Sequence, residues 1–201
     1  TLIREGVESI INPFDENALE AALVLKETMG AKVTVVSMGP PQVESALKEA
    51  MGRGADNVVL ISGRGFAGAD SLATSYALAE GIKALPEKAD LILFGKQAID
   101  GDTAQVGPGV AELLDLPVIT YVRKLEVSGN TVKVERVFED GFERMEAPMP
   151  VVLTVLKEMN VPRMASLKGK MRAKKEPVKV LTEKDINADP DRIGLKGSPT
   201  W

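Results

Sequence analysis

Short apolar runs alternate with longer amphipathic stretches along the first half of the chain. The runs are rich in valine, isoleucine and leucine and have the length of buried strands, whereas the stretches repeat their apolar residues at helical spacing. The pattern predicts helices over residues 16–29, 41–51, 70–85 and 103–114, and strands over residues 32–38, 57–61 and 89–94. Strands that alternate with helices imply right-handed crossovers and a mostly parallel sheet covered on both faces. The predicted fold class is therefore α/β, with a doubly wound, Rossmann-like sheet.

Turn and capping residues support the first two helices. Asn12-Pro13 is typical of a turn, Asp15 can cap the helix after it, and Gly30 can end that helix. Pro41 suits the first turn of the second helix, where its missing amide proton costs no hydrogen bond. The first helix is therefore expected to begin at Glu16.

The pattern changes after Pro117, where apolar and polar residues alternate with a period of two. This alternation predicts a β-hairpin and further strands, over residues 118–127, 131–138, 143–146 and 151–156. Beyond Met159 the chain becomes a basic tract and then a polar tail that contains proline and glycine. Such a tail has too little apolar surface to order itself alone, so we expect it to lie as an arm across a partner protein.

Composition excludes several classes of function. The 201 residues include no cysteine and no histidine, which rules out disulfides, thiolate nucleophiles, imidazole bases and ordinary zinc or iron–sulfur sites. Any demanding chemistry is therefore expected to belong to a bound cofactor. The net charge of −4 argues against a dedicated nucleic-acid binder, and no apolar run is long enough to span a bilayer. The sequence predicts a water-soluble protein of the cytoplasm.

The first candidate motif is Gly63-Arg64-Gly65-Phe66-Ala67-Gly68, a G-x-G-x-x-G pattern between a predicted strand and a predicted helix. A dinucleotide-binding fingerprint requires that context. The loop is longer than the fingerprint turn, however, and no acidic residue ends a second strand about twenty residues further on. An NAD site and a flexible strand-to-helix connection are both compatible with this motif.

The second candidate is the loop from Gly95 to Pro108, at the carboxyl end of a predicted strand, where open α/β sheets bind ligands. Asp102 or Thr103 can cap the following helix, whose first amide groups and dipole suit a phosphate. Lys96 can add a positive charge, and Asp100 can accept hydrogen bonds from ribose hydroxyls. A polar loop with a helix cap, or a Mg²⁺ site at the two aspartates, would show the same spacing.

The third candidate is the basic tract, in which cations and apolar residues are interspersed: Met164, Leu167, Lys168, Lys170, Met171, Arg172, Lys174 and Lys175. A run of charge is often only a solvated segment. The apolar residues favour docking to an acidic protein surface, steered by charge and anchored by one apolar side chain. The tract has no aromatic residue, which disfavours stacking of single-stranded nucleic acid.

Several strings together resemble the beta subunit of electron-transferring flavoproteins, over nearly the whole chain. They are Ser9 to Asp15 (SIINPFD), Ser37 to Pro40 (SMGP), Gly95 to Pro108 (GKQAIDGDTAQVGP), and Asn160 to Arg163 (NVPR) with the basic tract. The Gly95–Pro108 block is highly specific to that family. The resemblance implies electron transfer within a heterodimer, whose larger alpha subunit carries an FAD.

The resemblance also implies the binding residues. The implied cofactor-binding residues are Asn12, Pro13, Phe14, Asp15, Met38, Gly95, Lys96, Gln97, Ala98, Ile99, Asp100, Gly101, Asp102, Thr103, Ala104, Gln105 and Val106. The implied partner-docking residues are Arg163, Leu167, Lys168, Lys170 and Met171. Leu167 stands where the family has the leucine that inserts into a flavin dehydrogenase. No residue is implied in covalent catalysis, and no metal is implied.

Members of this family differ in the nucleotide that the beta subunit holds. Mitochondrial and many bacterial members hold AMP as a structural group, whereas electron-bifurcating members hold a second FAD that accepts a hydride from NADH. The strings Asp102–Pro108 and Phe66–Asp70 resemble the bifurcating branch, so the resemblance favours FAD over AMP. The alternatives are an AMP-binding scaffold without a redox role and a stand-alone NAD-dependent oxidoreductase.

The resemblance divides the chain into three parts. Residues 1–158 would form the nucleotide-binding domain, residues 159–176 a partner-recognition loop, and residues 177–201 the start of an arm on the alpha subunit. The family's first strand is expected to be missing before Thr1, and its C-terminal arm to be cut short at Trp201. A bacterial or archaeal cytoplasm is favoured over the mitochondrial matrix, with no nucleic-acid or membrane partner.

Overall fold

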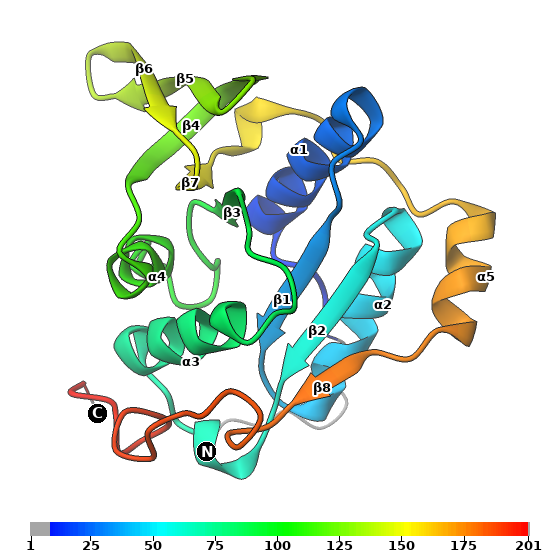
Figure 1. Cartoon of the computed structure of the whole chain (residues 1–201), viewed down its shortest axis with the longest axis vertical. Helices are drawn as coiled ribbons and strands as arrows, with labels where there is room; N and C mark the ends of the chain where they lie inside the picture. The colour runs from blue at the N-terminus through cyan, green and yellow to red at the C-terminus, as the bar shows by residue number, and fades with distance from the viewer. Residues whose placement is uncertain (1–8, 201) are drawn as a thin grey trace.

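A computed structural model describes residues 9–200 of the chain (Figure 1). Its helices are α1 (Pro13–Met29), α2 (Glu44–Arg53), α3 (Ser71–Lys83), α4 (Val106–Leu114) and α5 (Leu167–Lys175). Its strands are β1 (Thr34–Met38), β2 (Asn57–Ile61), β3 (Leu91–Gly95), β4 (Val118–Ser128), β5 (Thr131–Phe138), β6 (Gly141–Pro148), β7 (Val151–Val155) and β8 (Lys179–Leu181). The four helices and seven strands expected up to residue 156 are all present; β2 and β5 have the expected bounds, and the ends of the others are shifted.

The strands form two sheets. The first has the order β1-β2-β8, and all of its strands are parallel. The second has the order β3-β7-β4-β5-β6, in which β3, β7 and the start of β4 are parallel, whereas β4, β5 and β6 form an antiparallel meander. The predicted α/β class and the predicted hairpin are therefore confirmed.

Strand β1 forms one edge of the first sheet, and strand β3 forms one edge of the second. Within residues 9–200, β1 pairs with β2 alone and β3 pairs with β7 alone. Apolar side chains of these edge strands, such as Val36 and Phe94, are only half-buried, whereas every residue of β7 is buried. The expectation of a missing first strand concerns polypeptide before Thr1, outside the described residues.

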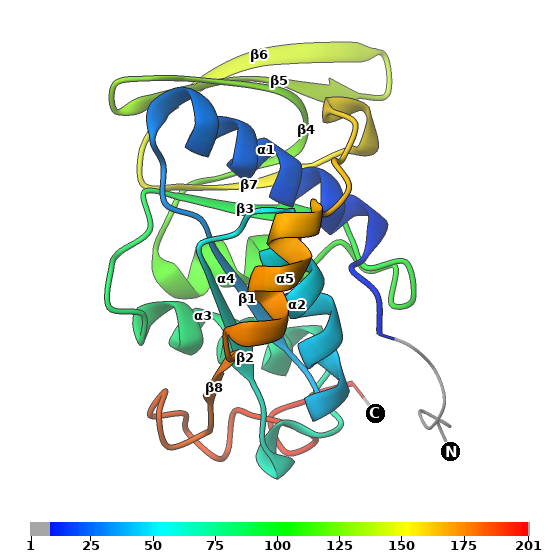
Figure 2. The ribbon, with the colours of Figure 1, turned by 90° about the vertical axis from the view of Figure 1, so that its right-hand side faces the viewer.

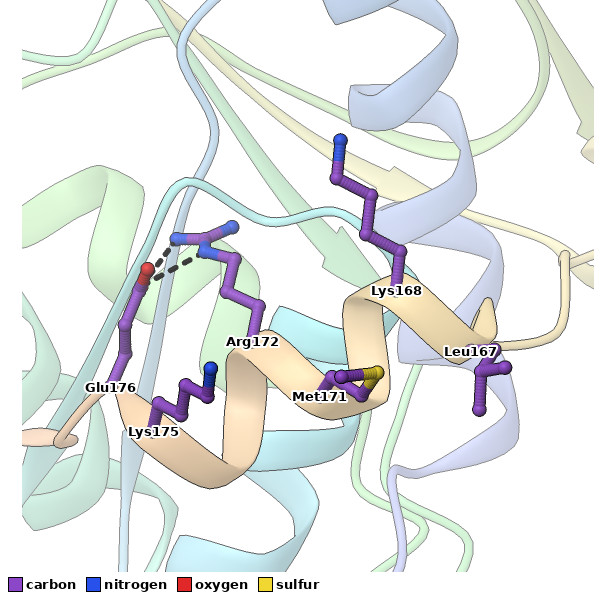
Figure 3. A pocket seen from close by; sticks show the side chains of 6 residues that line it. All are labelled: Leu167, Lys168, Met171, Arg172, Lys175 and Glu176. Atoms are coloured by element: carbon purple, nitrogen blue, oxygen red, sulfur yellow. Dashed lines mark hydrogen bonds and ion pairs between the residues drawn. The ribbon is translucent and has the colours of Figure 1, made fainter.

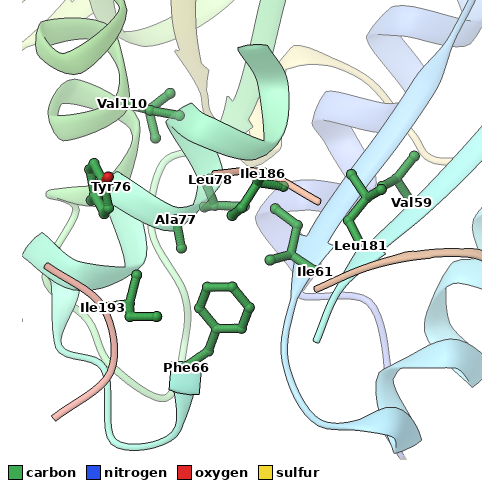
Figure 4. Close-up of a cluster of buried hydrophobic side chains, with 11 residues drawn as sticks. Val59, Ile61, Phe66, Tyr76, Ala77, Leu78, Val110, Leu181, Ile186 and Ile193 are labelled. Carbon is green, nitrogen blue, oxygen red and sulfur yellow. The ribbon is translucent and has the colours of Figure 1, made fainter. Parts of the chain in front are cut away.

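Helices cover both faces of the first sheet because β2 is apolar on both sides. Val59 and Ile61 face a cluster formed with α3, the start of α4 and the C-terminal segment (Figure 4). Val58 and Leu60 face the opposite cluster, which contains residues of α1, α2 and α5. Burial on both faces produces the continuous apolar run that identifies β2 in the sequence.

The second sheet has its own core. Val122, Val132, Val151 and Leu153 are fully buried there, and Ala18 of α1 packs on the same cluster. The antiparallel strands β4, β5 and β6 extend beyond the parallel strands as a separate layer at one end of the molecule (Figure 2). The second sheet thus combines a parallel, helix-covered part with an antiparallel part that is exposed along β6.

The expectation that the C-terminal tail cannot order itself is wrong. Residues 179–181 form β8 against β2, and the polar segment after them buries Ile186 and Ile193 against α3. The Tyr76 hydroxyl accepts a hydrogen bond from the Asp189 amide at 3.0 Å. A few apolar side chains, spaced along a polar sequence, suffice because α3 supplies the rest of the core. Packing of this arm on an alpha subunit stays a prediction.

Two helix boundaries also differ from expectation. Helix α1 begins at Pro13 with Asn12 as its N-cap residue, so Asp15 does not cap it. The basic tract, expected as a loop, is the helix α5, which begins at Leu167 because the Ser166 hydroxyl accepts a hydrogen bond from the Gly169 amide. Among the helices of residues 9–200, none combines the length and apolar character that crossing a bilayer requires.

Candidate functional site

The start of α1 is joined to the loop after β3, and both belong to the sequence-predicted nucleotide site. The Asn12 side chain donates to the Gln97 carbonyl at 2.9 Å and accepts from the Ile99 amide at 3.1 Å. The Asp15 carboxylate accepts from the Gly95 amide at 2.7 Å and from Asn12 at 2.9 Å. The structure therefore assembles these five predicted residues, from two distant segments, into one hydrogen-bonded junction.

Gly95 lets α1 approach β3 this closely. A Cβ atom on Gly95 would lie 2.5 Å from the Phe14 carbonyl carbon and 2.6 Å from the Asp15 nitrogen. Neither backbone atom can move without displacing the first turn of α1. Glycine at position 95 is thus a condition for the junction.

The Asp15 carboxyl is enclosed at the junction. Burial raises its pKa above the ordinary value for aspartate, while hydrogen bonds from the Gly95 amide and the Asn12 side chain act in the opposite direction. The pKa of Asp15 is therefore higher in the folded state than in the unfolded chain. The contribution of Asp15 to the free energy of unfolding is present below the unfolded-state pKa and is lost as the pH rises through the folded-state pKa. Asp15 is the kind of perturbed carboxyl that is common at binding sites.

The loop between β3 and α4 has an unusual backbone. Asp102 and Ala104 have φ angles of 52° and 54°, in the left-handed region that residues with a Cβ rarely adopt. The Asp102 amide donates to the Ala98 carbonyl at 2.8 Å, and the Asp102 carboxylate accepts from the Gln97 side chain. Residues 98–103 are exposed to solvent, and Asp100 and Gly101 lie in the middle of this segment.

Helix α4 starts later than the sequence suggests, and the expected caps are wrong. It begins at Val106 with Gln105 as N-cap residue, and no side chain caps it. Thr103 lies two residues before this N-cap position, and its hydroxyl accepts a hydrogen bond from the Gln105 amide at 3.5 Å rather than from an amide of the helix. Since Pro108 has no amide proton, Val106 and Gly107 carry the first amide groups of the helix.

Cationic and aromatic side chains meet beside this loop. The Lys96 ammonium lies 6.0 Å from the Phe14 ring centroid and 5.5 Å from the Tyr121 ring centroid. The Lys157 ammonium lies 4.8 Å from the Phe14 ring. Tyr121 and Lys157 were not found by sequence reasoning, because neither belongs to a motif: Tyr121 lies within β4, and Lys157 begins the 3₁₀ turn that follows β7.

The remaining predicted cofactor residues are more scattered. Pro13 is the first residue of α1 and Met38 is the last residue of β1. Met38, Phe94 and Val106 pack on the same apolar cluster. In the described part of the chain no group of three or more acidic residues is placed to hold a metal ion.

The Gly63–Gly68 loop is filled by the chain itself. The Gly65 amide donates to the Glu183 carboxylate at 2.7 Å, and a Cβ atom on Gly63 would lie 2.3 Å from the same carboxylate. The loop contains a short 3₁₀ turn, Arg64–Phe66, whose Phe66 side chain is buried in the core. These glycines therefore make room for the C-terminal segment.

Arg163 lies in the predicted docking segment but is bound within the chain. Its guanidinium contacts the Glu20 carboxylate at 2.9 Å and the Glu27 carboxylate at 2.5 Å, and its amide donates to Glu20 at 3.0 Å. Burial opposes ionisation of Glu20, yet the bonds from Arg163 outweigh it and hold the pKa of Glu20 below its usual range. The contacts anchor residues 160–166 to α1.

The other predicted docking residues lie on α5 with exposed side chains. Leu167, Lys168 and Met171 line a shallow pocket with Arg172, Lys175 and Glu176 (Figure 3). Leu167 is 78% exposed, and neighbouring Met164 is 84% exposed. Large apolar side chains in this degree of contact with water, beside cations, are typical of an interaction site. Lys170, also exposed, lies on the same helix.

Helix α5 packs closely on α2 (Figure 2). A Cβ atom on Gly169 would lie 1.9 Å from the Gly52 carbonyl oxygen, so the two helices touch at backbone distance. The Arg172 guanidinium donates to the carbonyls of Ala55 and Asp56 at 2.8 and 2.7 Å. The buried Ala173 completes the contact. The exposed side of α5 is thereby held in a fixed position.

Known proteins resemble this chain over its whole length. A family model described as the electron transfer flavoprotein domain matches residues 1–186. The chain is 57% identical, over 200 residues, to the electron transfer flavoprotein subunit beta of Clostridium acetobutylicum. The matched region covers all of this chain and 76% of the relative. The chain is 50% identical, with the same coverage, to the caffeyl-CoA reductase-Etf complex subunit CarD of Acetobacterium woodii. It is 44% identical to the acryloyl-CoA reductase electron transfer subunit gamma of Anaerotignum propionicum, of which it covers 77%.

Proposed function

The chain belongs to the electron transfer flavoprotein family, as a beta subunit that serves electron transfer in a heterodimer, and we propose that its part is to hold an adenine nucleotide. The proposed site is the junction of Asn12–Asp15 with the loop from Gly95 to Val106. The observation that carries this proposal is the hydrogen-bonded assembly of those two segments at the carboxyl end of β3.

The groups at this junction suit a nucleotide. The uncapped amides of Val106 and Gly107 and the dipole of α4 favour a phosphate, and the Lys96 ammonium adds a positive charge. The exposed Asp100 carboxylate is available to ribose hydroxyls. The Phe14 ring offers a flat apolar surface. Phosphate, sugar and base therefore each find a suitable partner.

We favour FAD over AMP in this site, with NADH as its reductant and electron bifurcation as the activity of the heterodimer. Two of the relatives carry names that assign them to caffeyl-CoA and acryloyl-CoA reductases, which is compatible with a redox-active nucleotide. FAD supplies the hydride and electron chemistry that the side chains of this chain lack. A structural AMP is the alternative.

The nucleotide content of the purified heterodimer tests this proposal. Denaturation releases the bound nucleotides, which chromatography identifies, while the visible spectrum of the intact protein counts the flavins. Two FAD per heterodimer are expected. One FAD with one AMP would support the structural alternative, and a heterodimer with no nucleotide beyond the FAD of the alpha subunit would refute binding at the junction.

We further propose that residues 159–176 dock a flavin dehydrogenase and that residues 177–201 pack on the alpha subunit, while residues 1–158 form the nucleotide-binding domain. The exposed Leu167 and Met171 beside Lys168 and Lys170 support the docking role. We place the heterodimer in the cytoplasm, on the absence of cysteine from the chain and the bacterial source of its relatives.

Replacing Leu167 by alanine is expected to slow electron transfer to the dehydrogenase about tenfold, since a buried apolar anchor contributes disproportionately to a docking interface. Nucleotide content and melting temperature are expected to stay unchanged, because the side chain is 78% exposed. Stopped-flow oxidation of the reduced flavin by the dehydrogenase measures the rate.

Leu72→Ala on α3 is the matched control, because its side chain is 53% exposed and lies outside the docking segment. It is expected to transfer electrons at the normal rate. Equal rates in the Leu167 and Leu72 variants would show that Leu167 does not anchor the dehydrogenase.

A further inference from the structure

Tyr121 has the most strained backbone among the aromatic residues of the described chain. Its φ angle is +60°, although it lies within the strand β4. Residues that carry a side chain rarely adopt this left-handed conformation, and for a bulky one it is a genuine outlier. Such outliers cost free energy and cluster at sites of function.

The strain at Tyr121 accompanies a β-bulge. Ile119 pairs with Leu153 of β7, but the next pairing is Val122 with Val155, so the register shifts between them. Ile119 and Val122 are both buried, three positions apart rather than two. In a regular strand Tyr121 would share the face of Ile119 and enter the core. The bulge instead turns the Tyr121 ring out of the core.

The ring is turned toward the proposed nucleotide site. Val122, Val155 and Gly95 occupy one register level, at the carboxyl ends of β7 and β3. At this level the Lys96 ammonium lies 5.5 Å from the Tyr121 ring and 6.0 Å from the Phe14 ring. Among residues 9–200 the Lys96 ammonium makes no ion pair, so the two rings are its neighbours.

We propose that Tyr121 is a further positioning residue of the nucleotide site, where its ring contacts the planar ring system of the bound nucleotide and holds Lys96 toward it. The inference rests on the proposed function and adds a residue that lies outside every motif of the chain. A bound heterocycle beside two aromatic faces and one cation gains both stacking and charge stabilisation.

The bulge by itself does not require tyrosine. The Tyr121 amide donates to the buried Thr154 hydroxyl at 3.2 Å, a contact that any residue with an amide proton makes. Glycine or asparagine would adopt the same backbone at lower cost. The strained tyrosine therefore contributes something that only its ring supplies.

The test compares Tyr121→Asn with Tyr121→Phe in the heterodimer. After removal of bound nucleotide, FAD and AMP are titrated separately, which distinguishes stacking on the flavin from stacking on the adenine. Tyr121→Asn is expected to raise the Kd of the nucleotide about tenfold, whereas Tyr121→Phe keeps the ring and stays within about threefold of the wild type. A rise for FAD alone assigns the contact to the flavin, and a rise for both assigns it to the adenine.

Asp115→Asn is the matched control. Asp115 has a φ angle of 54° and ends α4, away from the nucleotide junction, so the change eases the same kind of strain and leaves both Kd values unaltered. In the nucleotide-free heterodimer, Tyr121→Asn is expected to melt within about 3 °C of the wild type, since the eased strain offsets the lost packing.

Each other outcome is decisive. A wild-type heterodimer that binds nucleotide and a Tyr121→Asn heterodimer that binds it equally well would overturn this inference alone. A Tyr121→Asn chain that fails to fold would assign the ring to packing and overturn the inference too. A wild-type heterodimer without nucleotide at this site would overturn the proposed function itself.

Discussion

Alanine at position 95 is expected to destabilise the subunit by about 3 kcal/mol and to abolish retention of the nucleotide. The added Cβ would lie 2.5 Å from the Phe14 carbonyl carbon and 2.6 Å from the Asp15 nitrogen. Backbone atoms cannot rotate away as a side chain does, so the first turn of α1 has to move off β3. That movement breaks the bond from the Gly95 amide to the Asp15 carboxylate and separates the two halves of the nucleotide site.

Urea unfolding and nucleotide extraction measure the two effects of Gly95→Ala. Gly101→Ala is the control for stability, because it lies in the same loop and nothing approaches its Cβ position within 4 Å. That control is expected to unfold within about 0.5 kcal/mol of the wild type. If Gly95→Ala unfolds at the wild-type urea concentration and retains its nucleotide, the close approach of α1 to β3 does not exist in solution.

Replacing Arg163 by alanine is expected to cost about 2–3 kcal/mol of the free energy of unfolding. The Glu20 side chain is 10% exposed, so loss of its partner leaves a carboxylate nearly buried and uncompensated. The loss is smaller than for a fully buried pair because 31% of the Arg163 side chain contacts water. Denaturant unfolding at neutral pH measures it, with Lys32→Ala, which breaks an exposed pair with Glu87, as the control near zero.

The ion pair between Arg163 and Glu20 also predicts how the difference in the free energy of unfolding between the wild type and Arg163→Ala depends on pH. The folded-state pKa of Glu20 lies below the unfolded one, so its contribution is present above the unfolded pKa and is lost as the pH falls through the folded pKa. The stability gap between wild type and Arg163→Ala is therefore expected to narrow in acid, below the ordinary pKa of glutamate. A gap that stays constant down to about pH 3 would show that packing, and not the ion pair, causes it.

The sequence predicted those elements whose own residues show a clear apolar pattern. Strand β2 is buried on both faces, and its predicted limits, residues 57–61, agree with the structure. The hairpin of β4 and β5 was equally clear, because one face is apolar and Gly129, with a φ angle of 59°, suits the turn. In these segments the local sequence and the tertiary environment favour the same structure.

The features that were missed depend on contacts between distant residues. The basic tract has no apolar stripe to signal a helix, and α5 forms because Gly169 fits against Gly52 and Arg172 reaches the end of α2. Tyr121 joins the site only through a bulge against β7. Neither the close packing of two backbones nor a left-handed φ angle produces a periodic pattern of apolar residues in the sequence.

The pairing of β2 with β8 has a consequence for how the subunit is made. Leu60 of β2 pairs with Val180 of β8, so the first sheet closes only after nearly the whole described chain has left the ribosome. Until then one edge of the apolar strand β2 is unpaired. Unpaired edges of apolar strands promote the aggregation of nascent chains. The loop that must close is long, and contacts of such high sequence separation form slowly. Chaperones that cover this open edge until β8 is made are therefore expected to increase the yield of folded subunit.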